Sequence, residues 1–304
     1  MVGEAEDGLR LDRFLVIRIP GWSRRHSHAA IAAGAVMVNR RRGRKGDMLR
    51  RGDVIDARLS EFIGELVGES DLALPILYED EAVVMVDKPA GMPAVALRPG
   101  DRGTVANALV GRYPELAGIG RPFEAGLVHR LDTPTSGVLG AARTADDWQR
   151  LRAQFSARQV GKLYVAAVRG SVAQPGAITT PIAHRPDDDR AMIACSADVR
   201  PGGARRAITR YRALQRWHES TLVAVTIATG VRHQIRVHLA SIGHPVLGDT
   251  LYGDQASATA APRLMLHAAR LALTHPRTGN RFAVRSPLPD DFRAALHQLA
   301  RSSR

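Results

Sequence analysis

Apolar positions follow a helical spacing at the start of the chain and an extended pattern soon after it. Between Leu9 and Ile17, apolar residues recur at the three- to four-residue intervals of a helix that faces a core. Ser23 can cap a second helix, and Gly34 suits its end. The apolar run 36–38 predicts a short strand. We therefore expect two helices and then a strand.

Farther along the chain, the pattern predicts a basic turn at 39–45, a strand that begins over 52–55, and a linker at 59–74. From residue 75 onward, strands are predicted at 82–86, over the small apolar residues after Thr135, and at 163–168, 207–213, 222–228, 264–273 and 282–285. Helices are predicted at 105–113, from Thr144 with Asp147 three residues later, at 232–242 and at 290–301.

This order of elements predicts an α+β protein. Residues 1–58 form a small α/β module, and residues 75–304 form a larger domain behind the linker at 59–74. Because the larger domain has many strands and few intervening helices, we expect a mixed, mainly antiparallel sheet flanked by helices.

Composition narrows the class of protein. The chain has 304 residues, of which 45% are hydrophobic, so most of it is expected to be globular. Its one cysteine, Cys195, excludes an internal disulfide and a multi-cysteine zinc site, and it fits a reducing compartment. No apolar run approaches the length of a membrane span. We expect a soluble, cytoplasmic protein without a membrane partner.

The positive charge is concentrated near the N-terminus. The net charge is +13, and residues 1–58 hold 13 Lys and Arg against 7 Asp and Glu, which makes +6. Such clustering favours a polyanion, most simply a nucleic acid. A solvated, arginine-biased surface is the alternative, because only three of the basic residues are lysine.

Several common chemistries have no support in the sequence. Neither a GxxxxGK[ST] nor a GxGxxG loop nor a GxSxG elbow occurs. His233 and His238 are five residues apart, which does not place both on one helical face, so no metal site is expected. One polar loop stands out, in which Asp132 follows His129 and Arg130. By itself, an aspartate in such a loop is most often a turn former.

Five stretches in order carry a resemblance to a known family. They are HRLDTPTSGVLGAART at 129–144, VVMVDKPAGMPAV at 83–95, KLYVAAVRG at 162–170, the stretch at 226–253 with HQIRVH, and RLMLHAARLALTHPRTG at 263–279. Together they resemble the RluA family of pseudouridine synthases, which isomerise selected uridines in ribosomal or transfer RNA.

The N-terminal segment carries a second resemblance. It is similar to the small RNA-binding module of ribosomal small-subunit protein S four. That resemblance places a set of basic residues on an RNA-binding face, namely Arg24, Arg25, Arg40, Arg41, Arg42, Arg44 and Lys45.

The family resemblance also implies roles for single residues. Asp132 is expected to be the catalytic carboxylate, acting as a nucleophile or as the base that begins elimination. Arg236 is its basic partner, Tyr164 stacks on the uracil and takes part in proton transfer, and Leu266 lines the pocket. Because pseudouridine is an isomer of uridine, the reaction needs no cofactor and no metal.

Contacts to RNA complete the expected site. The target nucleotide must leave the RNA stack, and Arg130 and His129 are expected to fill the vacated space or hold the flipped phosphate. The family commonly has arginine where this chain has Val231, so Arg232 becomes the candidate phosphate contact. Thr133 and Pro134 also depart from the family pattern, which bears on specificity.

Three functions remain open on these grounds. The first is an RNA pseudouridine synthase that acts as a monomer. The second is a catalytically silent RNA-binding protein with the same fold. The third is an unrelated nuclease, against which the missing clusters of metal ligands count.

Overall fold

The computed structural model describes residues 1–19, 22, 24–58, 66–98, 100–195 and 202–301. The chain forms two compact units. Unit 1 comprises residues 1–72 and 95–126, and unit 2 comprises residues 73–94 and 127–304. None of the helices within the described residues is long and apolar enough to cross a membrane.

The N-terminal part of unit 1 is built from short helices and a three-stranded antiparallel sheet in the order β2-β1-β3. Its elements are η1 (Glu4–Glu6), α1 (Leu11–Arg18), α2 (Arg24–Ala32), β1 (Val36–Val38), β2 (Arg41–Arg42) and β3 (Ile55–Ala57). Leu11, Phe14, Leu15, Trp22 and Leu49 are buried in its core. Both predicted helices and the first strand are therefore present.

Details of this module differ from the predictions. The basic turn contains β2, because Arg41 pairs with Val38 across a tight hairpin. The strand predicted from residue 52 begins only at Ile55, after a turn in which Asp53 accepts from the backbone of Arg50. The capping prediction for Ser23 lies outside the described residues.

The second part of unit 1 contains α3 (Val105–Arg112) and η2 (Pro114–Gly118). Asn107 of α3 donates to the carbonyl of Val67, and the Glu69 carboxylate accepts from the backbone of Gly103. These contacts attach residues 66–72, which we had expected in a linker, to α3. Residues 95–126 therefore belong to unit 1, whereas the sequence had suggested their inclusion in the larger domain.

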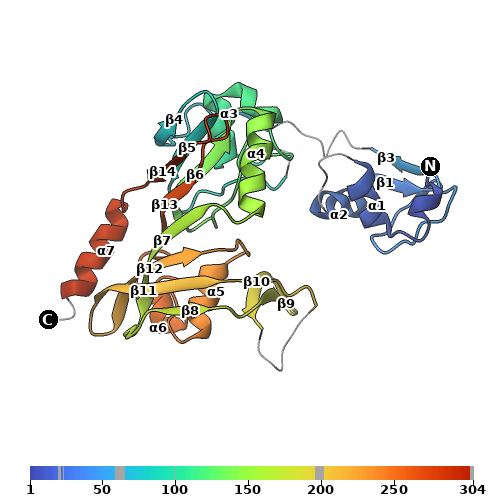
Figure 1. The fold of residues 1–304 in the computed structure, drawn as a ribbon. Coiled ribbons are helices and arrows are strands. Elements are labelled where there is room, and N and C mark those ends of the chain that lie inside the picture. The colour runs from blue at the N-terminus through green and yellow to red at the C-terminus, as the bar shows by residue number, and fades with distance from the viewer. Residues whose placement is uncertain (20–21, 23, 59–65, 99, 196–201, 302–304) are drawn as a thin grey trace. The chain divides into compact units, whose positions relative to one another are not determined.

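Unit 2 is organised around one large sheet (Figure 1), in the order β4-β5-β6-β13-β7-β12-β11-β8 with β14 beside β13. Its strands are β4 (Ile76–Glu79), β5 (Val83–Lys88), β6 (Ser136–Ala142), β7 (Gly161–Arg169), β8 (Gly176–Ile178), β11 (Thr209–Arg216), β12 (Ser220–Ile227), β13 (Leu266–Thr274) and β14 (Arg281–Arg285). The pair β6–β13 is parallel and the other pairs described for this sheet are antiparallel. The expected mixed, mainly antiparallel sheet is confirmed. A separate hairpin of β9 (Ile182–Arg185) and β10 (Asp188–Ala194) was not predicted.

Unit 2 also contains helices. They are α4 (Ala145–Ser156), α5 (Gln234–Ser241), α6 (Gln255–Thr259) and α7 (Asp290–Arg301). Helix α4 packs on β6 and β13 and begins where the Thr144 hydroxyl accepts from the backbone of Asp147, as expected. Its Leu151 joins a core that includes Val138 and Leu271.

The two faces of the sheet differ in their cover. Helix α5 is fastened to one face, because Gln234 and His238 both hydrogen-bond to the Thr209 hydroxyl on β11. Two residues farther along β11, Tyr211 points to the same face, and its cross-strand neighbours Val225 and Tyr164 do so too. We call this side the α5 face and the opposite side the back face.

Candidate active site

The loop that carries Asp132 enters β6 under tight backbone constraints. The carbonyl of Asp132 accepts from the backbone of Thr135, which closes a turn. Gly137 follows with a φ of 116°, and a Cβ at this position would lie 2.3 Å from the carbonyl oxygen of Ala268. Only glycine fits such an approach. The loop is thereby held against β13, with the Asp132 side chain 24% exposed.

A buried arginine joins Asp132 to a second carboxylate. Arg236 of α5 donates from Nε and Nη2 to both oxygens of Asp249, at 2.8 and 2.7 Å. Its remaining terminal nitrogen, Nη1, donates to Asp132 Oδ2 at 3.4 Å. Such a two-pronged pairing fixes the guanidinium plane. The structure therefore brings the expected pair, Asp132 and Arg236, together.

Asp249, which holds Arg236, is a residue of this site that the sequence did not single out. Its side chain is fully buried, and it also accepts from the backbones of Leu251 and Tyr252. Gly248, with a φ of 75°, sets its position, because a Cβ there would overlap the carbonyl of Arg263. Burial would lower the pKa of the Arg236 guanidinium, but the hydrogen bonds and charge of Asp249 raise it. A permanent cation thus faces Asp132.

His233 faces the other oxygen of Asp132, with Nε2 at 3.9 Å from Oδ1. It has a left-handed backbone at the start of α5, with φ 56°. The Tyr252 hydroxyl accepts from the backbone of Met192, which leaves its own hydrogen for His233 Nδ1 at 2.7 Å. We infer from these contacts that the imidazole proton is on Nε2, toward Asp132. Burial lowers the pKa of His233, although Asp132 opposes this, so the ring is neutral at pH 7.

Lys88 is a second residue that the sequence analysis missed. Its side chain is buried at the end of β5, and its ammonium donates to the carbonyls of Pro89, Met92 and Thr133 at 2.9, 2.6 and 2.9 Å. Burial lowers the pKa of Lys88 to about 7, and the charge of Asp132 opposes this shift. Lys88 therefore ties the residue after Asp132 to the loop that follows β5.

Tyr164 and Leu266 lie on the α5 face, the side of the sheet from which Arg236 of α5 reaches Asp132. Tyr164 is buried on the α5 face of β7, and burial together with the charge of Asp132 raises the pKa of its hydroxyl. The hydroxyl therefore stays protonated at neutral pH. Leu266 pairs with Ala166, two residues from Tyr164, so the two side chains share a face.

The other predicted contacts of unit 2 are distributed differently. His129 accepts from the backbone of Gly140 through Nε2 and stacks on Phe155 with 5.0 Å between ring centres. Burial lowers its pKa to about 3, so the ring is neutral. These contacts are with the protein, whereas Arg130 is exposed beside Asp132. Arg232 donates to the carbonyls of Asp189 and Arg190, which ties β10 to the segment that leads into α5.

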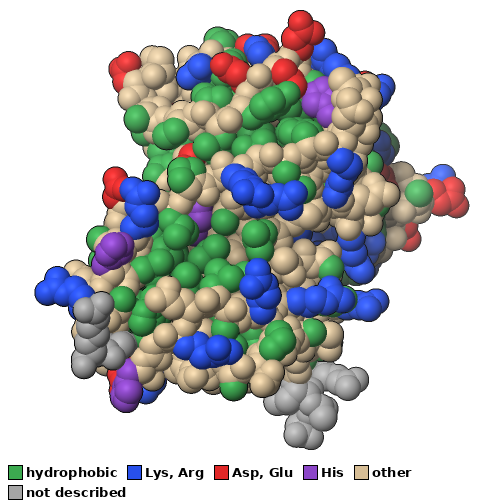
Figure 2. Space-filling model, turned by 60° about the vertical axis from the view of Figure 1, so that its left-hand side comes forward, with side chains coloured by type: hydrophobic (Ala, Val, Ile, Leu, Met, Phe, Trp, Pro, Cys, Tyr) green, Lys and Arg blue, Asp and Glu red, His purple; other side chains and the backbone are tan. Residues whose placement is uncertain are grey.

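The basic residues of the N-terminal module lie on its surface. Arg24, Arg40, Arg41, Arg42, Arg44 and Lys45 are exposed, and the side chain of Arg25 lies outside the described part. Arg42 also donates to the carbonyl of Ala32 at the end of α2. Elsewhere, Figure 2 shows a face with many Lys and Arg side chains among apolar ones.

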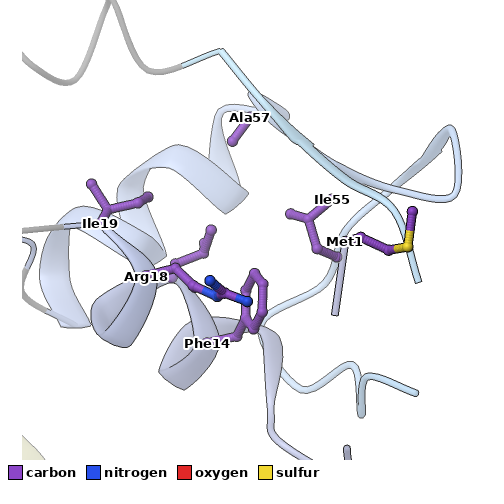
Figure 3. Close-up of a pocket in the computed structure, with 7 residues that line it drawn as sticks. Met1, Phe14, Arg18, Ile19, Ile55 and Ala57 are labelled. Carbon is purple, nitrogen blue, oxygen red and sulfur yellow. The ribbon is translucent and has the colours of Figure 1, made fainter. Parts of the chain in front are cut away.

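A pocket of the module has another character (Figure 3). It is about 340 Å³ in volume and is lined mainly by apolar side chains, among them Phe14, Ile19 and Ile55. Its charged residue, Arg18, is held by Glu6 at 2.5 Å. The pocket therefore does not offer the polar groups of a nucleotide site.

The arrangement around Asp132 suits carboxylate chemistry. One oxygen is held by a permanent cation, and the carboxylate is partly exposed for a substrate. Such a group can attack an electrophilic carbon or remove a proton. Within the described residues, no group of three or more His, Cys, Asp and Glu side chains is placed to hold a metal ion.

Comparisons with known proteins identify the family of the chain. The family described as RNA pseudouridylate synthase matches residues 82–241. The chain is 36% identical to a ribosomal large subunit pseudouridine synthase D of Nitrosomonas europaea, over 96% of this chain and 85% of that protein. It is 41% identical to an uncharacterized RNA pseudouridine synthase of Chloroflexus aurantiacus, over 95% of this chain and 90% of that protein. Human RNA pseudouridylate synthase domain containing 1 superposes with a TM-score of 0.61 at 26% identity, over 77% and 95%. The chain therefore belongs to the RNA pseudouridylate synthase family, of the RluA type that its motifs indicated.

Proposed function

We propose that this pseudouridine synthase isomerises uridines of large-subunit ribosomal RNA, with Asp132 as the reacting group. The observation that carries the proposal is the Asp132–Arg236–Asp249 arrangement, in which a doubly held guanidinium faces a partly exposed carboxylate. Relatives named as ribosomal large subunit pseudouridine synthase D, one of them from Pseudomonas aeruginosa, support the choice of RNA.

The chain's residues divide the reaction between them. Asp132 either attacks C1′ of the ribose and displaces N1 of uracil, or removes the proton from C2′ so that the bond from C1′ to N1 breaks by elimination. The base turns and C1′ joins C5, as the bond from Asp132 to C1′ breaks or the proton returns to C2′. The C5 proton is then lost and N1 is protonated. Arg236 holds Oδ2 of the carboxylate throughout, which leaves Oδ1 for the substrate. Tyr164 lies on the same side of the sheet and supplies a ring for the uracil face.

Substrate capture rests on exposed cations. Arg130 is exposed two residues before Asp132 and is suited to replace the extruded nucleotide, at a cost of about a few kcal/mol for unstacking. The exposed arginines of the N-terminal module would bind phosphates at a distance from the target. His129 has its own protein contacts, and its role toward RNA stays a prediction.

The assembly and location are part of the same proposal. Asp132, His233 and Arg236 all belong to unit 2, so one chain is enough to form this part of the site, and we infer a monomeric enzyme. Cys195 is buried and unpaired, which fits a reducing compartment such as the cytoplasm.

Replacement of the carboxylate tests the proposal. Large-subunit ribosomal RNA transcripts are incubated with the unchanged chain, with Asp132→Asn and with Asp146→Asn, and pseudouridine is mapped by chemical adduct stops. Asp146 is exposed on α4 and pairs with Arg150, so it is the matched control. We expect product with the unchanged chain and the control, and none with Asp132→Asn. Tight RNA binding without any product would instead support a silent RNA-binding protein.

A further inference from the structure

Three arginines stand in one row across the back face of the large sheet. Strand pairing aligns Arg210 of β11 with Thr226 of β12, Thr226 with Leu163 of β7, and Leu163 with Arg270 of β13. Arg270 in turn lies directly opposite Arg285 of β14. Cross-strand partners point to the same face, so these five side chains form a single row.

The row points away from the Asp132 site. Arg210 follows Thr209, whose hydroxyl binds α5, and Leu163 precedes Tyr164. Adjacent residues of a strand point to opposite faces. The arginines are therefore on the back face, and four strand spacings separate Arg210 from Arg285, about 19 Å.

The row is accessible. Arg210, Thr226 and Arg285 are exposed and Arg270 is half-buried. Arg212, two residues from Arg210, adds a third exposed arginine on this side. A phosphate chain that crosses the strands would meet cations at both ends of the row.

No acidic side chain among the described residues pairs with these arginines. The acids at the start of α7, which is next to this face through the Phe292–His267 contact, are engaged elsewhere. Asp291 pairs with Arg263, and Asp290 pairs with Arg293.

The pair Arg270–Arg285 is unfavourable in the free protein. Like charges directly opposite each other on neighbouring strands destabilise a sheet. An anionic ligand would remove this repulsion by placing negative charge between the two guanidiniums. Arginine suits phosphate oxygens because its donors form a fixed fork.

We propose that this row, Arg210, Arg270 and Arg285, binds the phosphate backbone of the substrate RNA outside the target nucleotide. The inference rests on the proposed function for the choice of RNA. A long, folded RNA can reach the back face while its target uridine is at Asp132, whereas a short stem-loop that fills the site cannot reach both. The row therefore contributes to affinity for long RNA and leaves the chemical step unchanged.

The test compares two triple variants of the full chain. One carries Arg210→Gln, Arg270→Gln and Arg285→Gln. The control carries Arg121→Gln, Arg158→Gln and Arg301→Gln, which removes the same charge from exposed positions outside the row. Each is assayed on a large-subunit ribosomal RNA fragment of several helices and on a short stem-loop with the same target uridine.

For the row variant on the long RNA, we expect KM to rise about tenfold with kcat unchanged. The magnitude of the slope of log affinity against log salt concentration should fall by about two to three, because each lost arginine removes about one phosphate contact. The stem-loop should show neither change, and the control should match the unchanged chain. Equal salt slopes and equal KM values for the two triple variants on the long RNA would overturn the inference. The same result is expected if the row binds an acidic protein instead of RNA. If the unchanged chain makes no product on either RNA, the proposed function fails, while the salt slope still reports on the row.

A single variant supplies a second readout. Arg285→Gln removes the like-charge contact with Arg270, so its melting temperature without RNA should be about 1 °C higher than that of the unchanged chain. A fall in melting temperature would show that Arg285 stabilises the sheet, which contradicts a role as a binding residue held at a cost to stability.

Discussion

Arginines of this enzyme occupy two opposite environments. Arg236 is 7% exposed and donates three hydrogen bonds to two carboxylates. In the N-terminal hairpin, by which we mean residues 36–44 with β1 and β2, the side chains of Arg41 and Arg44 are exposed, and none of the contacts described for the chain pairs either side chain with an acid. The guanidinium of Arg236 is held in one position, whereas those of Arg41 and Arg44 are confined only to one region of the surface. The difference corresponds to two tasks, because a reacting carboxylate needs a cation at one place and a phosphate chain accepts cations at many.

The backbone of the hairpin is nevertheless held by hydrogen bonds. Asn39 and Arg40 have left-handed backbones, and the Asn39 side chain donates to Asp53 and accepts from the backbone of Val54. The backbone is thus held, while the side chains of Arg41 and Arg44 stay exposed. Substitutions in the Asp132 site should therefore change kcat and stability, and those in the hairpin should change affinity and its salt dependence.

The largest effect is expected from Asp249→Asn. The substitution leaves the buried Arg236 cation without its bidentate partner, which costs about 3–5 kcal/mol of unfolding free energy. A displaced guanidinium would also lower kcat about a hundredfold. Urea unfolding and single-turnover kinetics measure both effects.

The matched control for that variant is Asp291→Asn. Asp291 also pairs with an arginine, Arg263, but is 52% exposed, so its loss should cost no more than about 1 kcal/mol. Equal urea midpoints for the two variants would mean that the Asp249–Arg236 pair contributes no more to stability than the exposed Asp291–Arg263 pair.

An intermediate effect is expected from Lys88→Met. Three carbonyls lose their donor, which should destabilise the enzyme by about 1–3 kcal/mol at pH 7. The effect depends on pH, because the pKa of Lys88 is about 7 in the folded enzyme and about 10.4 in an unfolded chain. Between these values the unfolded chain binds more protons, so the stability of the unchanged enzyme rises with pH.

Urea unfolding at pH 6, 7, 8 and 9 measures that dependence. The stability of the unchanged enzyme relative to Lys88→Met should be constant below pH 7 and should increase by up to about 2 kcal/mol by pH 9. A difference that does not vary with pH would show that the ammonium keeps an ordinary pKa.

The sequence was sufficient to bring together the two residues to which we assign the reaction. Asp132 and Arg236 are 104 residues apart, yet their motifs placed them in one site, and the structure pairs them. Helix α4 was also predicted, because its cap at Thr144 and its apolar face are local signals. The predictions of α4 and of the Asp132–Arg236 pair therefore rest on local sequence signals and on recognised motifs.

Other features depend on packing that no local pattern shows. Asp249 lies in a turn, where an aspartate is commonplace, and only the fold buries it against Arg236. Strand β10 contains three polar residues at its start, so its pattern resembles a loop until β9 pairs with it. Residues 95–126 join unit 1 through contacts such as the one between the rings of His26 and Phe123, at 5.8 Å. Such long-range partners are the part that a single sequence does not contain.

The smallest effect on stability is expected in the hairpin, from the double variant Arg41→Gln and Arg44→Gln. Loss of two exposed cations should reduce the salt slope of RNA binding by about 1.5–2 and raise KM, with kcat unchanged. The unfolding free energy should stay within about 0.5 kcal/mol of the unchanged enzyme, because no described contact of either side chain is lost.

The double variant Arg10→Gln and Arg51→Gln is the matched control for the hairpin. These arginines belong to the same module but are near carboxylates, Arg10 at 3.0 Å from Asp12 and Arg51 at 3.7 Å from Glu4. Since those acids already offset part of their charge, the salt slope should fall less than for Arg41 and Arg44. Equal falls would mean that the module attracts RNA through its total charge alone, and the contrast between free and paired arginines would then extend only to the Asp132 site.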